Sequence, residues 1–309
     1  MNVFTSLAEL ASLPQPIVLA IGVFDGVHLG HQSVIGAAIE RAQAVGGSAV
    51  VMTFDPHPLR VLRPEVAPRL LCSTAHLCLL LERVGLKQLL LFPFDKSVAS
   101  TEAELFVRQI AAGCGRLESI FVGETWRFGK GRAGDVAMLT RIGAELGFTA
   151  VGISPIKLGD DVVSSTLVRA AVDAGDFARA KALLGRDYSV LGHVIAGRKR
   201  ARQLGWPTAN VDVQGTLLPP TGVYCVEACI AGQWKRGVAN LGYRPTVAAA
   251  GEAMALEVHV LDFTGDLYDQ ALEVRFLSKL RNEKKFSGLE ELKTQIAADV
   301  EQVRAIEQK

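Results

Sequence analysis

Residues 22–31, with the sequence GVFDGVHLGH, restrict the fold more than any other stretch of this chain. They follow an apolar run, Ile17–Ile21, that is typical of a buried strand, and they precede a helical pattern over Gln32–Ala44. A strand that passes through a glycine-rich turn into a helix presents free backbone N–H groups and the positive end of the helix dipole to an anion. The pattern therefore predicts a phosphate site. Its expected lining residues are Gly22, Phe24, Asp25, Gly26 and Gly30.

Two histidines belong to this turn. His28 and His31 are three residues apart, so both fall on one side of the first helical turn. There they can hydrogen-bond a triphosphate and meet the charge that builds on a leaving pyrophosphate. The sequence has no GxxxxGK stretch followed by Ser or Thr, so the ordinary kinase phosphate loop is not the explanation. Zinc binding by the two histidines is an alternative, although no cysteine or further histidine lies nearby.

The first half of the sequence alternates strand-like and helical segments, a pattern typical of a parallel sheet covered on both faces. The strand-like runs are Ile17–Phe24, Ser48–Phe54, Gln88–Phe94, Ser119–Gly123 and Thr149–Ile153. Ligands bind such sheets at the carboxyl ends of the strands. Because residues 22–31 lie at one of these ends, we expect a nucleotide there.

Capping signals mark the starts of two helices in this half. Thr101 and Glu104 form a capping box before a segment that runs to Cys114. Asp135 can cap a helix that ends at Leu146.

The pattern changes after Leu184. Between Tyr188 and Phe276 the apolar runs are short, β-rich and interrupted by glycine and proline. This predicts a small antiparallel barrel or sandwich, and we expect the barrel. Ser287 and Glu290 then form a capping box before an amphipathic closing helix.

The length of 309 residues exceeds that of one ordinary domain. We therefore expect a fold of the α/β plus β class with two domains. A Rossmann-like domain with a parallel sheet would span residues 1–185, and a β-barrel domain with the closing helix would span residues 186–309.

Three further clusters lie at strand ends or at a helix start of the first half. TFDPHP ends the second strand-like run, residues 123–135 combine glycines with aromatic and cationic side chains, and SSTLVR begins a helix. Each alone is also explained by an ordinary turn, a surface loop or a helix cap. Together they place several anion donors at one edge of the sheet. The expected ligand contacts are Phe54, Asp55, His57, Thr125, Arg127 and Phe128, and the expected phosphate contacts are Ser164, Ser165, Thr166 and Arg169.

A second set of motifs lies in the β-rich half. A glycine-bearing hairpin over residues 192–205, rich in arginine and lysine, can fold over a polyphosphate or be solvated. Thr208 and Asn210 are separated by one residue, so in an extended segment both point to the same side and offer the oxygen ligands that Mg²⁺ prefers. Glu257 can accept a proton from an alcohol, or lie exposed on a sheet rim. The expected phosphate-binding residues of this half are Gly192, Gly197, Arg198, Gly205, Thr208 and Asn210.

In this order the motifs resemble those of the prokaryotic bifunctional riboflavin kinase/FMN adenylyltransferases, also called FAD synthetases. Residues 22–31 are similar to the signature of nucleotidylyltransferases, and the resemblance to the riboflavin kinase module runs from Gly185 to Asp299. The resemblance implies a nucleotidylyltransferase domain and a kinase domain. It implies that ATP phosphorylates riboflavin to FMN and then adenylylates FMN to FAD. His28 and His31 would be catalytic in the second reaction, as stabilisers of the leaving pyrophosphate.

For the kinase reaction, the resemblance implies that Thr208 and Asn210 organise Mg²⁺ and the ATP phosphates. Glu257 would be the catalytic base on the ribityl hydroxyl of riboflavin, and Arg275 and Arg281 would lie near the flavin.

The sequence departs from the family at several positions. Thr125 stands where the family usually carries an acidic or amide residue, Ala201 and Asp269 stand where it usually carries glycine, and residues 247–250 replace a Phe-Gly-Gly-like turn. Two other readings stay open from the sequence. One is a monofunctional nucleotidylyltransferase for another phosphate acceptor, and the other is a flavin-binding protein without catalytic activity.

Composition restricts the partners and the compartment. The chain has 33 basic and 32 acidic residues, a net charge of +1, which gives no reason to expect nucleic acid or an anionic membrane as a partner. No apolar run reaches the roughly 18 residues that span a bilayer. The N-terminus lacks a secretory pattern, and five scattered cysteines suggest free thiols in a reducing cytoplasm. We expect a monomer or weak homo-oligomer whose partners are small-molecule substrates.

Overall fold

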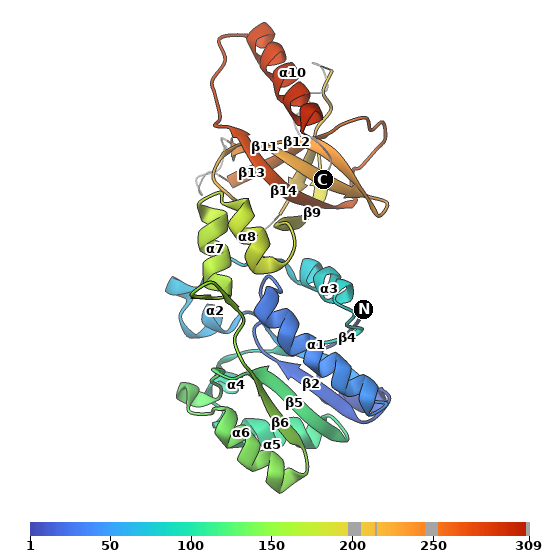
Figure 1. Cartoon of the computed structure of the whole chain (residues 1–309), viewed down its shortest axis with the longest axis vertical. Helices are drawn as coiled ribbons and strands as arrows, with labels where there is room; N and C mark the ends of the chain where they lie inside the picture. The colour runs from blue at the N-terminus through green and yellow to red at the C-terminus, as the bar shows by residue number, and fades with distance from the viewer. Residues whose placement is uncertain (197–204, 214, 245–252, 307–309) are drawn as a thin grey trace. The chain divides into compact units, whose positions relative to one another are not determined.

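The structure, a computed structural model, describes the chain except for residues 197–204, 214, 245–252 and 307–309 (Figure 1). The chain divides into two compact units. The first comprises Met1–Arg69 and Thr74–Ser165, and the second comprises Leu70–Ser73 and Thr166–Lys309.

A six-stranded parallel sheet forms the centre of the first unit, as the alternating pattern predicts. Its spatial order is β1-β4-β3-β2-β5-β6. The strands are β1 (Asn2–Phe4), β2 (Ile17–Ile21), β3 (Ser48–Asp55), β4 (Gln88–Pro93), β5 (Leu117–Gly123) and β6 (Thr149–Ile153). From β2 the chain adds β3 and β4 on one side, then crosses to add β5 and β6 on the other. The direction of winding therefore reverses beside β2, and the carboxyl end of β2 lies where this fold binds ligands.

Helices cover both faces of this sheet. Ile17, Leu19 and Ile21 belong to a buried cluster that includes residues of α5 (Ala103–Gly113) and α6 (Val136–Leu146). Successive strand side chains alternate between faces. α1 (Leu29–Ala44), which contacts β2, β3 and β5, contributes nothing to that cluster and covers the opposite face (Figure 1). The shorter helices of this unit are α2 (Pro58–Leu62), α3 (Thr74–Arg83) and α4 (Lys96–Ser100).

One of the two predicted caps in this unit is confirmed. Asp135 precedes α6, and its carboxylate accepts a hydrogen bond of 2.9 Å from Met138 N. The predicted capping box at Thr101 is wrong, because α5 begins after Glu102 without a side-chain cap. The Thr101 hydroxyl instead donates to Ser97 O, so it satisfies a carbonyl group of α4, the preceding helix.

The second unit contains a closed barrel of antiparallel strands, which confirms the predicted β-barrel. The strand order around it is β10-β13-β12-β11-β14-β9. The strands are β9 (Ser189–Ile195), β10 (Ala209–Asp212), β11 (Gly222–Ile230), β12 (Gln233–Arg244), β13 (Ala253–Val260) and β14 (Ala271–Arg281). The closing helix is α10 (Leu289–Ala305), whose Val300 and Val303 pack against Val223 and Val238 of the barrel wall.

The predicted cap of α10 is off by one residue. Gly288 precedes the helix, and the backbone N–H and hydroxyl of Ser287 donate to Glu291 at 2.9 and 2.8 Å. Glu290, the expected partner, instead pairs with Lys293.

The division between the units differs from the predicted boundary at residues 185/186. The compact units separate between Ser165 and Thr166, so α8 (Phe177–Leu184) belongs with the barrel. The reason is aromatic packing. The Phe177 ring stacks on Phe276 at 5.7 Å between centroids and meets Tyr224 edge-on at 5.8 Å.

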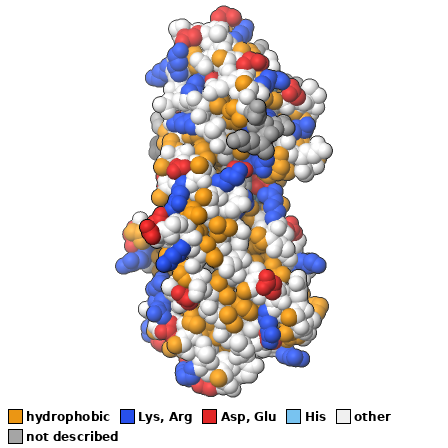
Figure 2. Space-filling model, in the orientation of Figure 1, with side chains coloured by type: hydrophobic (Ala, Val, Ile, Leu, Met, Phe, Trp, Pro, Cys, Tyr) orange, Lys and Arg blue, Asp and Glu red, His pale blue; other side chains and the backbone are white. Residues whose placement is uncertain are grey.

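Surface charge is mixed on both units. Figure 2 shows basic and acidic side chains interspersed over the face in view, as a nearly neutral chain would present. Among the described residues, no helix has the length and apolar character to cross a membrane.

Candidate functional sites

The turn after β2 brings the start of α1 to the carboxyl edge of the first sheet. Gly22 N donates to Met52 O of β3 at 3.1 Å, so the chain leaves the sheet only after this residue. Gly26 and Val27 then adopt positive φ angles of 81° and 43°, which reverse the chain. The Gln32 side chain donates to Val27 O at 2.9 Å and holds the turn against α1. The predicted strand–turn–helix is present, and its helix N-terminus lies at the point where the sheet reverses its winding.

The two histidines of this turn occupy different positions, His28 just before α1 and His31 within its first turn. His28 is the N-cap of α1, and its Nδ1 accepts a hydrogen bond of 3.3 Å from His31 N. In the neutral ring the proton must then lie on Nε2, which makes that atom a donor. The rings of His28 and His31 stack with centroids 3.5 Å apart, and Phe24 meets the His31 ring edge-on at 5.2 Å. The fold therefore brings two imidazoles together beside the helix start.

Zinc finds no support at this site. Among the residues that the structure describes, no group of three or more His, Cys, Asp or Glu side chains could hold a metal ion.

Part of the SSTLVR motif reaches this turn. Ser165, the first residue of α7 (Ser165–Asp173), donates from its hydroxyl to Asp25 O at 2.9 Å. A Cβ atom on Gly30 would lie 3.2 Å from the His28 ring, a tight contact, so this glycine permits the close approach of the ring; Val163 O, at 3.6 Å, would be in ordinary contact. Thr166 and Arg169 belong to the second compact unit, and their phosphate contact stays a prediction.

The TFDPHP segment lies at the carboxyl end of β3. His57 caps α2, with Nδ1 accepting a hydrogen bond of 3.1 Å from Leu59 N. Asp55 is exposed, whereas Phe54 is half-buried in an aromatic cluster with Phe92, Phe94 and Phe106. The cluster holds Phe54 at the edge of the core. The ligand contacts predicted for Phe54, Asp55 and His57 stay predictions.

The glycine-rich segment after β5 folds onto itself. Phe128 is buried, and its ring stacks on Trp126 at 4.5 Å between centroids. Arg127 forms an ion pair of 2.9 Å with Asp135. The Met138 N–H, together with Arg127, holds the pKa of Asp135 below its ordinary value. Thr125, two residues after the end of β5, is exposed. Ligand contact by Thr125, Arg127 and Phe128 stays a prediction.

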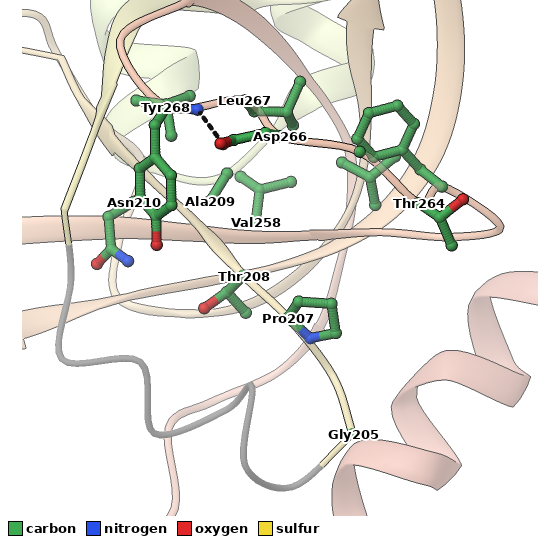
Figure 3. A pocket seen from close by; sticks show the side chains of 14 residues that line it. Gly205, Pro207, Thr208, Ala209, Asn210, Val258, Thr264, Asp266, Leu267 and Tyr268 are labelled. Atoms are coloured by element: carbon green, nitrogen blue, oxygen red, sulfur yellow. Dashed lines mark hydrogen bonds between the residues drawn. The ribbon is translucent and has the colours of Figure 1, made fainter.

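A cavity of about 610 Å³ lies in the barrel unit (Figure 3). Sequence patterns indicated one side of it, because Gly205, Thr208 and Asn210 line it. They missed the segment Phe263–Tyr268, which lines the other side (Figure 3). In this segment Asp266 accepts a hydrogen bond of 2.9 Å from Tyr268 N. Both sides carry polar groups among apolar ones, and a concave site that mixes apolar walls with a few polar groups is typical of small-molecule binding.

Strand register brings Glu257 beside Asn210. The two residues are direct partners in the antiparallel pair of β10 and β13, and Asn240 of β12 is the partner of Glu257 on its other side. Directly opposed residues share a face and have Cβ atoms about 4.5–5.5 Å apart. Glu257 itself does not line the cavity, whereas its neighbour Val258 does. Thr208 and Asn210 therefore line the cavity, while Glu257 is linked to it only as the cross-strand partner of Asn210, and its task as a base stays a prediction.

The glycines predicted to bind phosphate in this unit have different environments. A Cβ on Gly192 would lie 2.2 Å from Asp212 O, so this glycine allows β9 and β10 to pair closely. Gly205 has a φ of 93°. Gly197 and Arg198 lie outside the described residues, as do Ala201 and residues 247–250.

The two arginines predicted to lie near the flavin are engaged in ion pairs. Arg275 pairs with the buried Glu227 and lies over the Trp234 ring at 4.3 Å. Arg281 donates to Asp299 of α10 at 2.7 Å. Both guanidinium groups connect elements of the barrel unit, and flavin contact stays a prediction for both.

Comparison with known proteins finds both halves of the chain in described families. A riboflavin kinase family model matches residues 184–307, and an FAD synthetase family model matches residues 10–167. The chain is 42% identical to the bifunctional riboflavin kinase/FMN adenylyltransferase of Pseudomonas fluorescens, over 99% of this chain and 98% of that protein. It is 37% identical to that of Escherichia coli strain K12, over 97% and 96%.

A relative of the same description from Bacillus subtilis strain 168 is 36% identical, over 91% of this chain and 90% of that protein. Among solved structures, one described as a macrolide-efflux protein from Streptococcus pneumoniae has a TM-score of 0.81 and 27% identity, covering 99% of both chains. This likeness supports the α/β and barrel folds.

Proposed function

Because the chain belongs to the bifunctional riboflavin kinase/FMN adenylyltransferase family, we propose that the barrel unit holds the kinase site and the first unit the adenylyltransferase site. The protein phosphorylates riboflavin to FMN with ATP, then transfers an adenylyl group from ATP to FMN, giving FAD and pyrophosphate. The observation that carries the assignment is that each half matches its own family model. A monofunctional nucleotidylyltransferase would lack the second match.

In the kinase reaction Glu257 accepts the proton of the ribityl hydroxyl as that oxygen attacks the γ-phosphorus of ATP, and ADP leaves as the bond from the γ-phosphorus to the bridging oxygen breaks. Its support is the register that sets Glu257 directly opposite Asn210. The Thr208 hydroxyl and the Asn210 amide oxygen fit Mg²⁺, which accepts a few protein oxygens and takes the rest of its ligands from water and phosphates. When bound there, the ion would neutralise charge on the ATP phosphates.

In the adenylyltransferase reaction the FMN phosphate is already an anion, so no strong base is needed when it attacks the α-phosphorus. The His28 Nε2–H, the His31 ring and the N–H groups at the start of α1 stabilise the negative charge that develops on pyrophosphate. The hydrogen bond from His31 N to His28 Nδ1 supports this assignment, because it sets the tautomer of His28. Gly22, Phe24, Asp25, Gly26 and Gly30 shape the phosphate turn.

The remaining contacts of the adenylyltransferase site follow the sequence motifs. Phe54, Asp55, His57, Thr125, Arg127 and Phe128 would contact the flavin end of FMN, and Ser164, Ser165, Thr166 and Arg169 would contact phosphate. Location in the cytoplasm and assembly as a monomer or weak homo-oligomer are part of the same proposal.

Two substitutions test the division of labour. Glu257→Gln should lower FMN formation by about 10²–10⁴-fold, the usual loss for a general base, while conversion of supplied FMN to FAD continues. His28→Asn should lower conversion of FMN to FAD while FMN formation continues. Asparagine is chosen because it is also a good N-cap and keeps the start of α1 intact. Glu301→Gln, which removes an exposed carboxyl on α10, is the matched control.

The assay is a chromatogram that resolves riboflavin, FMN and FAD after incubation with ATP. Chelation of Mg²⁺ with EDTA should stop FMN formation, and added Mg²⁺ should restore it. The proposal of two separate sites would be wrong if either substitution abolished both activities in a protein that stays folded.

A further inference from the structure

We propose that His259 is a positioning residue of the kinase reaction, which holds the Thr208–Asn210 segment through the carbonyl group of Pro207. The inference rests on the proposed function, since it assigns a task within the same site. His259 lies on β13, two residues after Glu257, and its Nδ1 lies 2.8 Å from Pro207 O. A carbonyl oxygen only accepts hydrogen bonds, so Nδ1 carries the proton and donates.

The bond occurs where the backbone ladder between β10 and β13 stops. The last pair of that ladder is Ala209 with Val258. Continuing the antiparallel register would set Thr208 opposite His259 and Pro207 one position further. Proline has no N–H to donate, so it cannot extend the ladder. The His259 side chain supplies a hydrogen bond to the backbone at this point.

The anchored group is the peptide that joins Pro207 to Thr208. The orientation of this peptide determines the direction in which the Thr208 side chain leaves the backbone. Thr208 lines the cavity (Figure 3). Glu257 and His259 share one face of β13, because residues two apart on a strand do so. β13 therefore carries both Glu257, the proposed base, and His259, which holds the segment of Thr208 and Asn210 beside it.

Upstream of the anchored peptide, Gly205 has a φ of 93° and does little to restrict the chain. Loss of the His259 hydrogen bond should therefore loosen the segment from residue 205 to the start of β10. The effect should be local, since the Asn210–Glu257 and Ala209–Val258 pairs remain.

Two substitutions of His259 separate hydrogen bonding from bulk. His259→Phe keeps a ring and removes the donor, whereas His259→Asn keeps an amide N–H near the place of Nδ1. In the full-length protein His259→Phe should raise the KM for Mg·ATP in FMN formation about fivefold, the worth of one hydrogen bond. His259→Asn should restore most of that loss, and conversion of FMN to FAD should not change.

Hydrogen–deuterium exchange without nucleotide or metal gives a second readout. His259→Phe should speed exchange in peptides covering residues 205–212, and His259→Asn should not. Wild-type exchange and KM in His259→Phe would overturn the proposal, and so would an asparagine variant as impaired as the phenylalanine one. Failure of the proposed function can be told apart from failure of the His259 proposal, because it would appear as FMN formation at the wild-type rate by Glu257→Gln.

Discussion

The packing of α8 on the barrel predicts which reaction fails first when that contact is removed. Phe177 is 6% exposed, and its ring contacts Phe276 and Tyr224. Truncating a buried phenylalanine to alanine costs about 3–5 kcal/mol of unfolding free energy. For a unit of roughly 150 residues this lowers the thermal midpoint by on the order of 10 °C. Phe177→Ala should therefore destabilise the kinase unit.

The assay uses each activity as a reporter of its own unit. The protein is heated briefly at a series of temperatures, cooled, and tested for FMN formation from riboflavin and for FAD formation from FMN. Phe177→Ala should lower the half-inactivation temperature of the kinase alone. Phe148→Ala is the matched control, because Phe148 is also 6% exposed but lies in the core of the first unit. It should lower the half-inactivation temperature of the adenylyltransferase alone.

The reasoning is refuted if Phe177→Ala leaves the kinase midpoint unchanged. A fall in the adenylyltransferase midpoint alone would place α8 with the first unit, as the sequence pattern predicted.

Three further predictions concern single positions. Gly30→Ala should reduce FAD formation without affecting FMN formation, because the added Cβ would lie 3.2 Å from the His28 ring and the ring must shift to accommodate it; unchanged FAD formation would contradict this. Ala231→Asn should stabilise the barrel unit by about 1 kcal/mol and so raise its thermal midpoint, since Ala231 and Gly232 have φ angles of 49° and 80° in the two-residue turn between β11 and β12. Ala231→Val should lower the midpoint. Hydrogen bonds from Lys284 and Ser287 lower the pKa of Glu291 from 4.5 to about 2, so its stabilising effect is complete above about pH 4.5 and is lost as the pH falls to 2. Midpoints of Glu291→Gln and the wild type should therefore differ at pH 7 and converge at pH 2.

Local patterns predicted two structural features of the first unit. The turn at residues 22–31 was predictable because apolar strand, glycines and helix follow one another in the chain, and each is a signal of short range. The Asp135 cap was predictable for the same reason. The predicted Thr101 cap of α5 was wrong because the Thr101 hydroxyl bonds to Ser97 O at the end of α4 instead. Which helix this hydroxyl serves depends on where α4 ends.

The sequence by itself determined the parallel sheet, the barrel, and the residue types that can bind phosphate, because these follow from the order and periodicity of neighbouring residues. Tertiary structure alone decided that α8 packs on the barrel, that Asn210 lies opposite Glu257, and that His259 reaches Pro207. Each of these depends on strand register or on contact between residues far apart in the chain. Such contacts arise only when the chain closes on itself, so no local pattern encodes them.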